Sequence, residues 1–115
     1  HAVSRYEIIK EAQMIREGVA VSALFHPVDR VTAAQAADEL LTISGFNASF
    51  VLFPDESGRV ILSARSSGDV NVQVITEALG GGGNAAVAGA QIPEKTVGEV
   101  LEALQAAIDR YCDNR

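Results

Sequence analysis

This sequence contains few of the residues from which many catalytic and metal sites are built. It has one cysteine, two histidines, three prolines and no tryptophan among its 115 residues. A single cysteine excludes an internal disulfide bond and a zinc site made of several cysteines, which is typical of a reducing compartment. With so few histidines, a hydrolytic metal centre would have to rely on carboxylates. We therefore expect few catalytic residues in this chain.

Long apolar runs are also absent. The longest apolar stretches have the length of a strand, far below the roughly 20 apolar residues that span a bilayer. The beginning of the sequence lacks the layout of a signal peptide. Hydrophobic residues make up 48% and charged residues 21% of the chain, an ordinary globular composition. We expect one soluble cytoplasmic domain over residues 1–115, and a membrane anchor elsewhere in a parent protein is left open.

Basic residues are scarce. Nine Lys and Arg stand against fifteen Asp and Glu, so the net charge is −6. This balance opposes non-specific binding to a nucleic-acid backbone, and no long nucleic acid is expected as a partner. The segment 59–84 is neutral, because Arg59 and Arg65 balance Asp69 and Glu77. We expect any anionic ligand to bind within this segment.

Apolar spacing, capping residues and turn residues predict the secondary structure. Helices are predicted over residues 4–16, over 32–45 with a Thr32 and Gln35 capping box, over 71–79 with Asn71 as N-cap, and after a Thr96 and Glu99 capping box. Strands are predicted over residues 19–25, 48–53, 60–64 and 85–92, with a β-hairpin around the turn 54–58. We therefore expect a single α/β domain, a mixed β-sheet with a hairpin and helices packed on it.

Four consecutive glycines, Gly80 to Gly83, follow the third predicted helix. Because glycine lacks Cβ, successive backbone amides can converge on one anion, and the anion can approach the main chain. The alternative is a helix C-cap with a flexible loop, although a cap needs only Gly80 and the other glycines cost backbone entropy. No lysine follows and no strand precedes, which excludes the P-loop and the dinucleotide fingerprint. The pattern favours a phosphate-binding loop over the cap.

Polar residues precede this loop. Arg65 ends a predicted strand, where its guanidinium could hold a phosphate through two hydrogen bonds or remain solvated. Ser66 could donate to a phosphate or form the turn, and Asn71 is first of all a helix N-cap. Asp38 and Glu39 are adjacent on a helix and do not face each other, which favours a solvated face over an acid/base pair.

Together these segments resemble the DHHA1 domain, the C-terminal substrate-binding domain of DHH-family phosphoesterases, and especially its cyclic-di-AMP phosphodiesterase branch. The likeness is carried by Ser63-Ala64-Arg65-Ser66, by Gly68, Asn71, Val72 and Gln73, by the four-glycine loop, and by the Ala-Gly-Ala-Gln strand at 88–91. It extends upstream to residues 33–38 and 48–51 and covers nearly the whole chain. The glycine loop after the arginine-serine segment is its most specific feature.

The resemblance implies that substrate binding and hydrolysis belong to two separate domains. A separate DHH domain, the partner of this one in the parent protein, would hold two metal ions, usually manganese, and hydrolyse cyclic-di-AMP to linear pApA. This chain would bind a cyclic dinucleotide or a short linear dinucleotide and would be inactive alone, with no catalytic or metal-ligating residue of its own. The implied substrate-binding residues are Arg65, Ser66, Asn71, Gly80, Gly81, Gly82, Gly83 and Asn84.

One position departs from the family pattern. The glycine loop commonly ends in histidine, and here that position is Asn84. Asparagine can still donate a hydrogen bond to a phosphate oxygen, but it cannot become cationic or transfer a proton near neutral pH. We expect the contact at Asn84 to persist and any charge or acid/base role to be lost.

Two other functions stay open. Related families use this domain in nucleases that act on short oligonucleotides or single-stranded DNA. The acidic balance and the lack of basic residues interleaved with aromatic ones count against a long strand. The second alternative is a non-catalytic module that senses nucleotides or mediates oligomerisation. Homodimer formation is left open.

Overall fold

The computed structural model describes residues 3–43 and 45–114. Its elements are α1 (Arg5–Lys10), β1 (Gln13–Arg16), β2 (Val19–Ala23), α2 (Arg30–Leu40), β3 (Ala48–Pro54), β4 (Val60–Ser66), α3 (Val72–Glu77), β5 (Gly82–Gly83), β6 (Val87–Ile92) and α4 (Val97–Asp113). The strands form one sheet in the order β1-β2-β3-β4-β6-β5. Only β2 and β3 pair in parallel, and the other neighbours are antiparallel. The expected α/β domain with a mixed sheet is confirmed.

The predicted hairpin forms the centre of the sheet. β3 and β4 pair without interruption from Ala48 opposite Ser66 to Pro54 opposite Val60. The carboxylate of Asp55 closes the turn, because its Oδ1 accepts hydrogen bonds from the Ser57 and Arg59 backbone N–H groups at 2.9 Å. The hairpin therefore has a fixed register, and that register decides which β4 residues point to each face.

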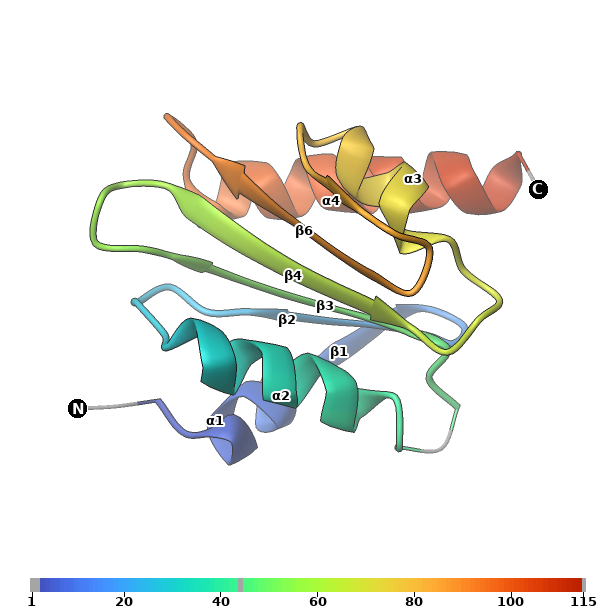
Figure 1. Ribbon diagram of the computed structural model, residues 1–115, viewed down its shortest axis with the longest axis horizontal. Coiled ribbons are helices and arrows are strands. Elements are labelled where there is room, and N and C mark those ends of the chain that lie inside the picture. The colour runs from blue at the N-terminus through green and yellow to red at the C-terminus, as the bar shows by residue number, and fades with distance from the viewer. Residues whose placement is uncertain (1–2, 44, 115) are drawn as a thin grey trace.

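Helices cover the two faces of the sheet to different extents (Figure 1). On one face, α3 and α4 pack on a core that includes Leu62 and Ala64 of β4 and reaches β6. On the other, α1 and α2 bury Val51, Phe53 and Ile61 of β3 and β4. The β6 residues on this second face remain largely uncovered, and Val87 is 46% exposed.

We call this uncovered part of the second face the open strip. It is formed by β4, β6 and β5, whose alternate residues point to it because side chains alternate along a strand. Its rows across the strands are set by the register, which places Ser63 opposite Gly89 and Gly89 opposite Gly82. Its residues are Ser63, Arg65, Gly82, Val87, Gly89 and Gln91, and the buried Ile61 borders it.

The helix predicted over residues 4–16 is wrong in its second half. α1 ends at Lys10, and residues 13–16 form β1, the edge strand beside β2. A single helix would place Ile8 and Ile15 on one face, but Ile8 packs in the core under α2 and Ile15 against the core under α4. Arg16 also pairs with Asp109 and Asp113 of α4, at 3.1 and 3.2 Å. These long-range contacts favour the extended form.

Three further boundaries differ from expectation. α2 is capped by Asp29, whose carboxylate accepts the Thr32 N–H, so the predicted Thr32 and Gln35 capping box is wrong. The helix ends at Leu40, before the expected stop at Gly45. The strand predicted over 85–92 begins at Val87, and Gly82–Gly83 form the unexpected β5.

The last two helices begin as predicted. Asn71 caps α3, and Thr96 with Glu99 forms a complete capping box at α4. In the described ranges 3–43 and 45–114, no helix has both the length and the apolar character needed to cross a membrane.

Candidate functional site

Three segments meet where β4 ends. The Ser66 N–H donates to the Ala86 carbonyl at 2.9 Å, and the Val72 N–H donates to the Ala85 carbonyl at 3.1 Å. These bonds hold the end of β4, the start of α3 and the loop after β5 together. Arg65 lies opposite Val87 in the register, next to this junction. The structure therefore brings the segments of Arg65, Ser66, Asn71 and Asn84 to one end of the sheet.

Arg65 points onto the open strip and is paired within the chain. Its Nε lies 3.0 Å from Oδ1 of Asp38 on α2, and its Nη1 donates to its neighbour's carbonyl, that of Ala64, at 2.9 Å. The side chain is 14% exposed, so the alternative of a solvated arginine does not apply. Nη2 has no partner among the described residues. Arg65 therefore keeps one guanidinium nitrogen for a ligand.

Ser66 and Asn71 use their side chains to shape the junction. Ser66 is buried, and its Oγ accepts the Gly68 N–H at 3.1 Å. It follows Arg65 in the strand, so the two side chains point to opposite faces. The Asn71 Oδ1 accepts the Gln73 and Val74 N–H groups, while its own N–H donates to the Tyr111 hydroxyl at 2.9 Å. Both residues hold the backbone rather than offering these oxygens outward.

The glycine loop does not form the cradle of converging amides expected from the sequence. The Gly80 N–H donates to the Glu77 carbonyl and the Gly81 N–H to the Thr76 carbonyl, at 3.1 and 2.9 Å. Gly82 and Gly83 continue into β5 and pair with β6. The loop is therefore a helix end followed by a short edge strand, because the chain itself satisfies the first two amides.

Close packing explains two of these glycines and backbone conformation a third. A Cβ at Gly81 or Gly83 would collide with the β6 backbone, and Gly80 has a φ of +84°. Gly82 differs from them. Its φ lies outside the left-handed region, and a Cβ there would meet no atom within 4 Å. The fold therefore leaves open space above Gly82, on the open strip.

Asn84 closes the turn between β5 and β6. Its Oδ1 accepts the Ala86 and Val87 N–H groups at 2.9 and 2.8 Å. Its Nδ2 has no partner in the described part of the chain. Asn84 is exposed, so this amide group can donate to a ligand.

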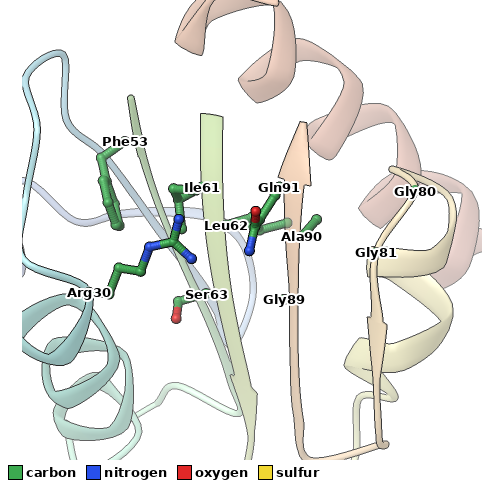
Figure 2. A pocket seen from close by; sticks show the side chains of 10 residues that line it. All are labelled: Arg30, Phe53, Ile61, Leu62, Ser63, Gly80, Gly81, Gly89, Ala90 and Gln91. Atoms are coloured by element: carbon green, nitrogen blue, oxygen red, sulfur yellow. The ribbon is translucent and has the colours of Figure 1, made fainter. Parts of the chain in front are cut away.

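A pocket that the sequence analysis missed lies further along the open strip (Figure 2). It has a volume of about 400 Å³ and is lined by Arg30, Phe53, Ile61, Leu62, Ser63, Gly80, Gly81, Gly89, Ala90 and Gln91. Figure 2 shows Arg30 and Gln91 on the two sides of β4. The alternation Arg59, Ile61, Ser63, Arg65 was the available signal, because its polar residues indicate that part of this face is uncovered.

The charged groups near the pocket are arranged by the hairpin turn. Arg30 Nη2 lies 3.5 Å from Oδ2 of Asp55. Hydrogen bonds, above all from the Ser57 hydroxyl, hold the pKa of Asp55 below its ordinary value. Across residues 3–43 and 45–114, no group of three His, Cys, Asp or Glu side chains is placed to hold a metal ion.

Sequence comparisons relate this chain to part of several larger enzymes. It is 47% identical over 113 residues to the cyclic-di-AMP phosphodiesterase GdpP of Geobacillus thermodenitrificans (strain NG80-2), covering 95% of this chain and 17% of that protein. The corresponding protein of Bacillus subtilis (strain 168) is 40% identical over the same coverage. The cyclic-di-AMP phosphodiesterase PdeA of Listeria monocytogenes is 38% identical over 93% of this chain and 17% of its own length. The chain thus spans about a sixth of these relatives.

Solved structures share the fold at low sequence identity. An exopolyphosphatase-related protein of Bacteroides fragilis superposes with a TM-score of 0.79 and 18% identity, over 96% of this chain and 36% of that one. A pGpG-specific phosphodiesterase of Vibrio cholerae gives a TM-score of 0.66 and 16% identity, over 93% and 38%. The DHHA1 domain family itself matches residues 16–114. With this match and the relatives above, the chain belongs to the DHHA1 domain family.

Proposed function

We propose that this chain is the substrate-binding domain of a DHH-family phosphodiesterase that hydrolyses cyclic-di-AMP to linear pApA. The observation that carries the proposal is the 47% identity to a cyclic-di-AMP phosphodiesterase over 95% of this chain. The geometry supports it, because Arg65 and the open space above Gly82 lie on the open strip, and Asn84 closes the turn that joins β5 to β6 beside it.

Each of these residues has a definite task in the proposal. Arg65 Nη2 and Asn84 Nδ2 are the donors that bind phosphate oxygens, because neither has a partner among residues 3–43 and 45–114. Gly82 lets the ligand approach the β5 backbone. Ser66 and Asn71 hold the junction in which Arg65 and Asn84 are placed. In this proposal the chain thus binds and orients the dinucleotide.

Hydrolysis belongs to a separate DHH domain in this proposal. Metal ions bound there, with manganese as our expectation, would lower the pKa of the attacking water. The described residues of this chain offer no cluster of metal ligands, so the proposal assigns them no metal-dependent step. We expect the 115-residue chain with added Mn²⁺ to bind cyclic-di-AMP without hydrolysing it.

An amide NMR titration tests the binding. The ligands are cyclic-di-AMP, linear pApA and a short single-stranded oligonucleotide. The adenine dinucleotides should shift the amides of Arg65 and of residues 80–84, and the oligonucleotide should not. Arg65→Gln should weaken the dinucleotide shifts. Arg5→Gln is the matched control, because Arg5 pairs with Glu39 of α2 at 2.8 Å, away from the open strip.

The titration can contradict the proposal in two ways. Absence of any dinucleotide shift around Arg65 and Asn84 would mean that this chain does not bind the nucleotide. Stronger binding of the oligonucleotide would instead favour the nuclease reading.

A further inference from the structure

The pocket on the open strip is continuous with the glycine loop, because Gly80 and Gly81 line it. Its volume of about 400 Å³ lies within the range of small-molecule sites, which is roughly 300 to 1,000 Å³. Ser63 and Gly89 line it as well and lie in the row next to Arg65, so a ligand whose phosphate is bound at Arg65 can extend into the pocket. This inference rests on the proposed function and concerns the part of the nucleotide that enters the pocket.

The surfaces of the pocket suit a flat ring. Phe53 and Ile61 are almost fully buried and give its floor an apolar part. Ser63 and Gly89, opposite each other in the register, add only a hydroxyl group and bare backbone. Arg30 reaches over this floor from α2 (Figure 2), and a guanidinium plane stacks well on an aromatic ring. A purine base can therefore lie between Arg30 and the sheet.

Gln91 presents a defined hydrogen-bonding edge to such a ring. Arg59 Nη1 donates to Gln91 Oε1 at 2.9 Å. Because arginine can only donate, the amide atom facing it must be the oxygen, which fixes the orientation of the whole amide group. Nε2 is left as a donor, and Oε1 keeps a second lone pair as an acceptor.

A purine edge complements this donor and acceptor pair. In adenine the N6 amine lies beside a ring-nitrogen acceptor at both N1 and N7, and glutamine pairs with the N6 and N7 edge in nucleic-acid recognition. Guanine offers N7 and O6, both acceptors, on the corresponding edge. It matches an amide through N1–H with O6 and through N2–H with N3. The amide of Gln91 therefore discriminates on the edge that carries N7, where adenine offers a donor and an acceptor and guanine offers two acceptors.

The local charge also favours a nucleotide. The chain carries a net charge of −6, yet Arg30 and Arg59 stand at this end of the strip. In the described ranges Arg59 forms no ion pair, and its partner Gln91 is neutral. Asp55, which faces Arg30, already accepts hydrogen bonds from Ser57 and Arg59. The cations at this end are therefore only partly compensated.

From this geometry we propose that the pocket holds one purine base of the dinucleotide and that Gln91, oriented by Arg59, reads the edge of that base. Arg30 covers the ring face. Gln91 is thus the specificity-determining residue of this chain, and its chemistry sets the preference between adenine and guanine.

The test is the ratio of the affinities for linear pApA and linear pGpG, measured by NMR titration of the 115-residue chain. In Gln91→Glu a carboxylate still contacts Arg59, but it offers two acceptors and no donor. It loses the bond to the adenine ring nitrogen and gains a match to the guanine N1–H and N2–H donors. The pApA to pGpG ratio should fall by about tenfold. The added negative charge repels the phosphates of both dinucleotides equally, so this effect cancels in the ratio.

Two controls accompany the ratio. Gln105→Glu makes the same charge change on an exposed position of α4 and should leave the ratio unchanged. Arg30→Leu should weaken both dinucleotides alike, because stacking does not read the base edge. In the unaltered chain, pApA should also shift the side-chain amide signal of Gln91 and the backbone amide of Gly89.

The outcomes separate this inference from the proposed function. If both dinucleotides shift Arg65 and the glycine loop while Gln91→Glu leaves the ratio unchanged, Gln91 does not read the base and only this inference is overturned. If the side-chain amide signal of Gln91 does not shift at saturating pApA, again only this inference is overturned. If neither dinucleotide binds at all, both the proposed function and this inference are overturned.

Discussion

The Arg65 guanidinium of β4 is held by the Asp38 carboxylate of α2, with 3.0 Å between Nε and Oδ1. The Asp38 side chain is 65% exposed and that of Arg65 only 14%, so the carboxylate remains hydrated while the guanidinium is largely enclosed. A ligand phosphate at Arg65 therefore meets a cation that is partly neutralised by Asp38. In the proposed function, Asp38 would therefore weaken the attraction of Arg65 for an anion.

Removing the Asp38 charge should strengthen dinucleotide binding. Asp38→Asn keeps the shape of the side chain, and the affinity should rise about twofold to fivefold, the scale of one exposed ion pair. Isothermal titration with pApA measures it. Glu39→Gln is the control, since Glu39 pairs with Arg5 instead. A lower affinity in Asp38→Asn would show that Asp38 serves to orient Arg65.

Adjacent glycines of the loop should respond in opposite ways. Gly81→Ala places a Cβ against Gly89 and Ala90 and should destabilise the fold by about 1 to 3 kcal/mol. Gly82→Ala has open space and an ordinary φ, so its stability should be unchanged or slightly higher. Its dinucleotide affinity should nevertheless fall, because the methyl group occupies the ligand's approach. Urea unfolding and NMR titration give the two readouts, and full affinity in Gly82→Ala would place the ligand elsewhere.

Asn84 tests the departure from the family pattern. Asn84→His should bind dinucleotides more tightly as the pH falls below about 6.5, where an ordinary imidazole becomes cationic. In the unaltered chain, Asn84 should not make the dinucleotide affinity depend on pH. Affinities at several pH values for both proteins decide the matter. Equal affinities with equal pH dependence would remove Asn84 from the site.

The capping box of α4 should make stability depend on pH. Hydrogen bonds from Thr96, first from its backbone N–H, lower the pKa of Glu99 below its ordinary value of 4.5. Because the folded-state pKa is the lower one, this contribution is full above 4.5 and is lost as the pH falls through the folded pKa.

Glu99→Gln should therefore reduce the loss of stability between neutral and acidic pH, as followed by urea unfolding. Asp55→Asn is a useful comparison, since its pKa is also lowered. Thr96→Ala should cost about 1 kcal/mol at neutral pH. An unchanged acid dependence in Glu99→Gln would mean that the capping carboxylate does not set it.

Local signals in the sequence were sufficient for several elements. The Asn71 cap and the Thr96 and Glu99 capping box were correctly predicted, because a cap joins residues two or three apart and depends little on the rest of the fold. The hairpin between β3 and β4 was also predictable, since its turn residues lie between two apolar strands. The order of these elements was enough to indicate a mixed α/β sheet.

Elements decided by distant contacts were not predictable in this way. Residues 13–16 have helical spacing, yet they become β1 because β2 offers a pairing edge and α4 offers partners for Arg16. Gly82 and Gly83 become β5 because β6 lies beside them. In both cases a long-range ladder overrides the local preference.

The candidate site shows the same division. The sequence by itself indicated which residues to propose for ligand binding, namely Arg65, Asn84 and the glycines, because motif and residue type are local properties. Three features followed only from the tertiary structure. Asp38 pairs with Arg65 and partly neutralises its charge, the Gly80 and Gly81 amides form hydrogen bonds within the chain, and Gln91 lines a pocket. These relationships join residues through strand register and helix packing, whose physical origin is burial of apolar surface across the whole domain.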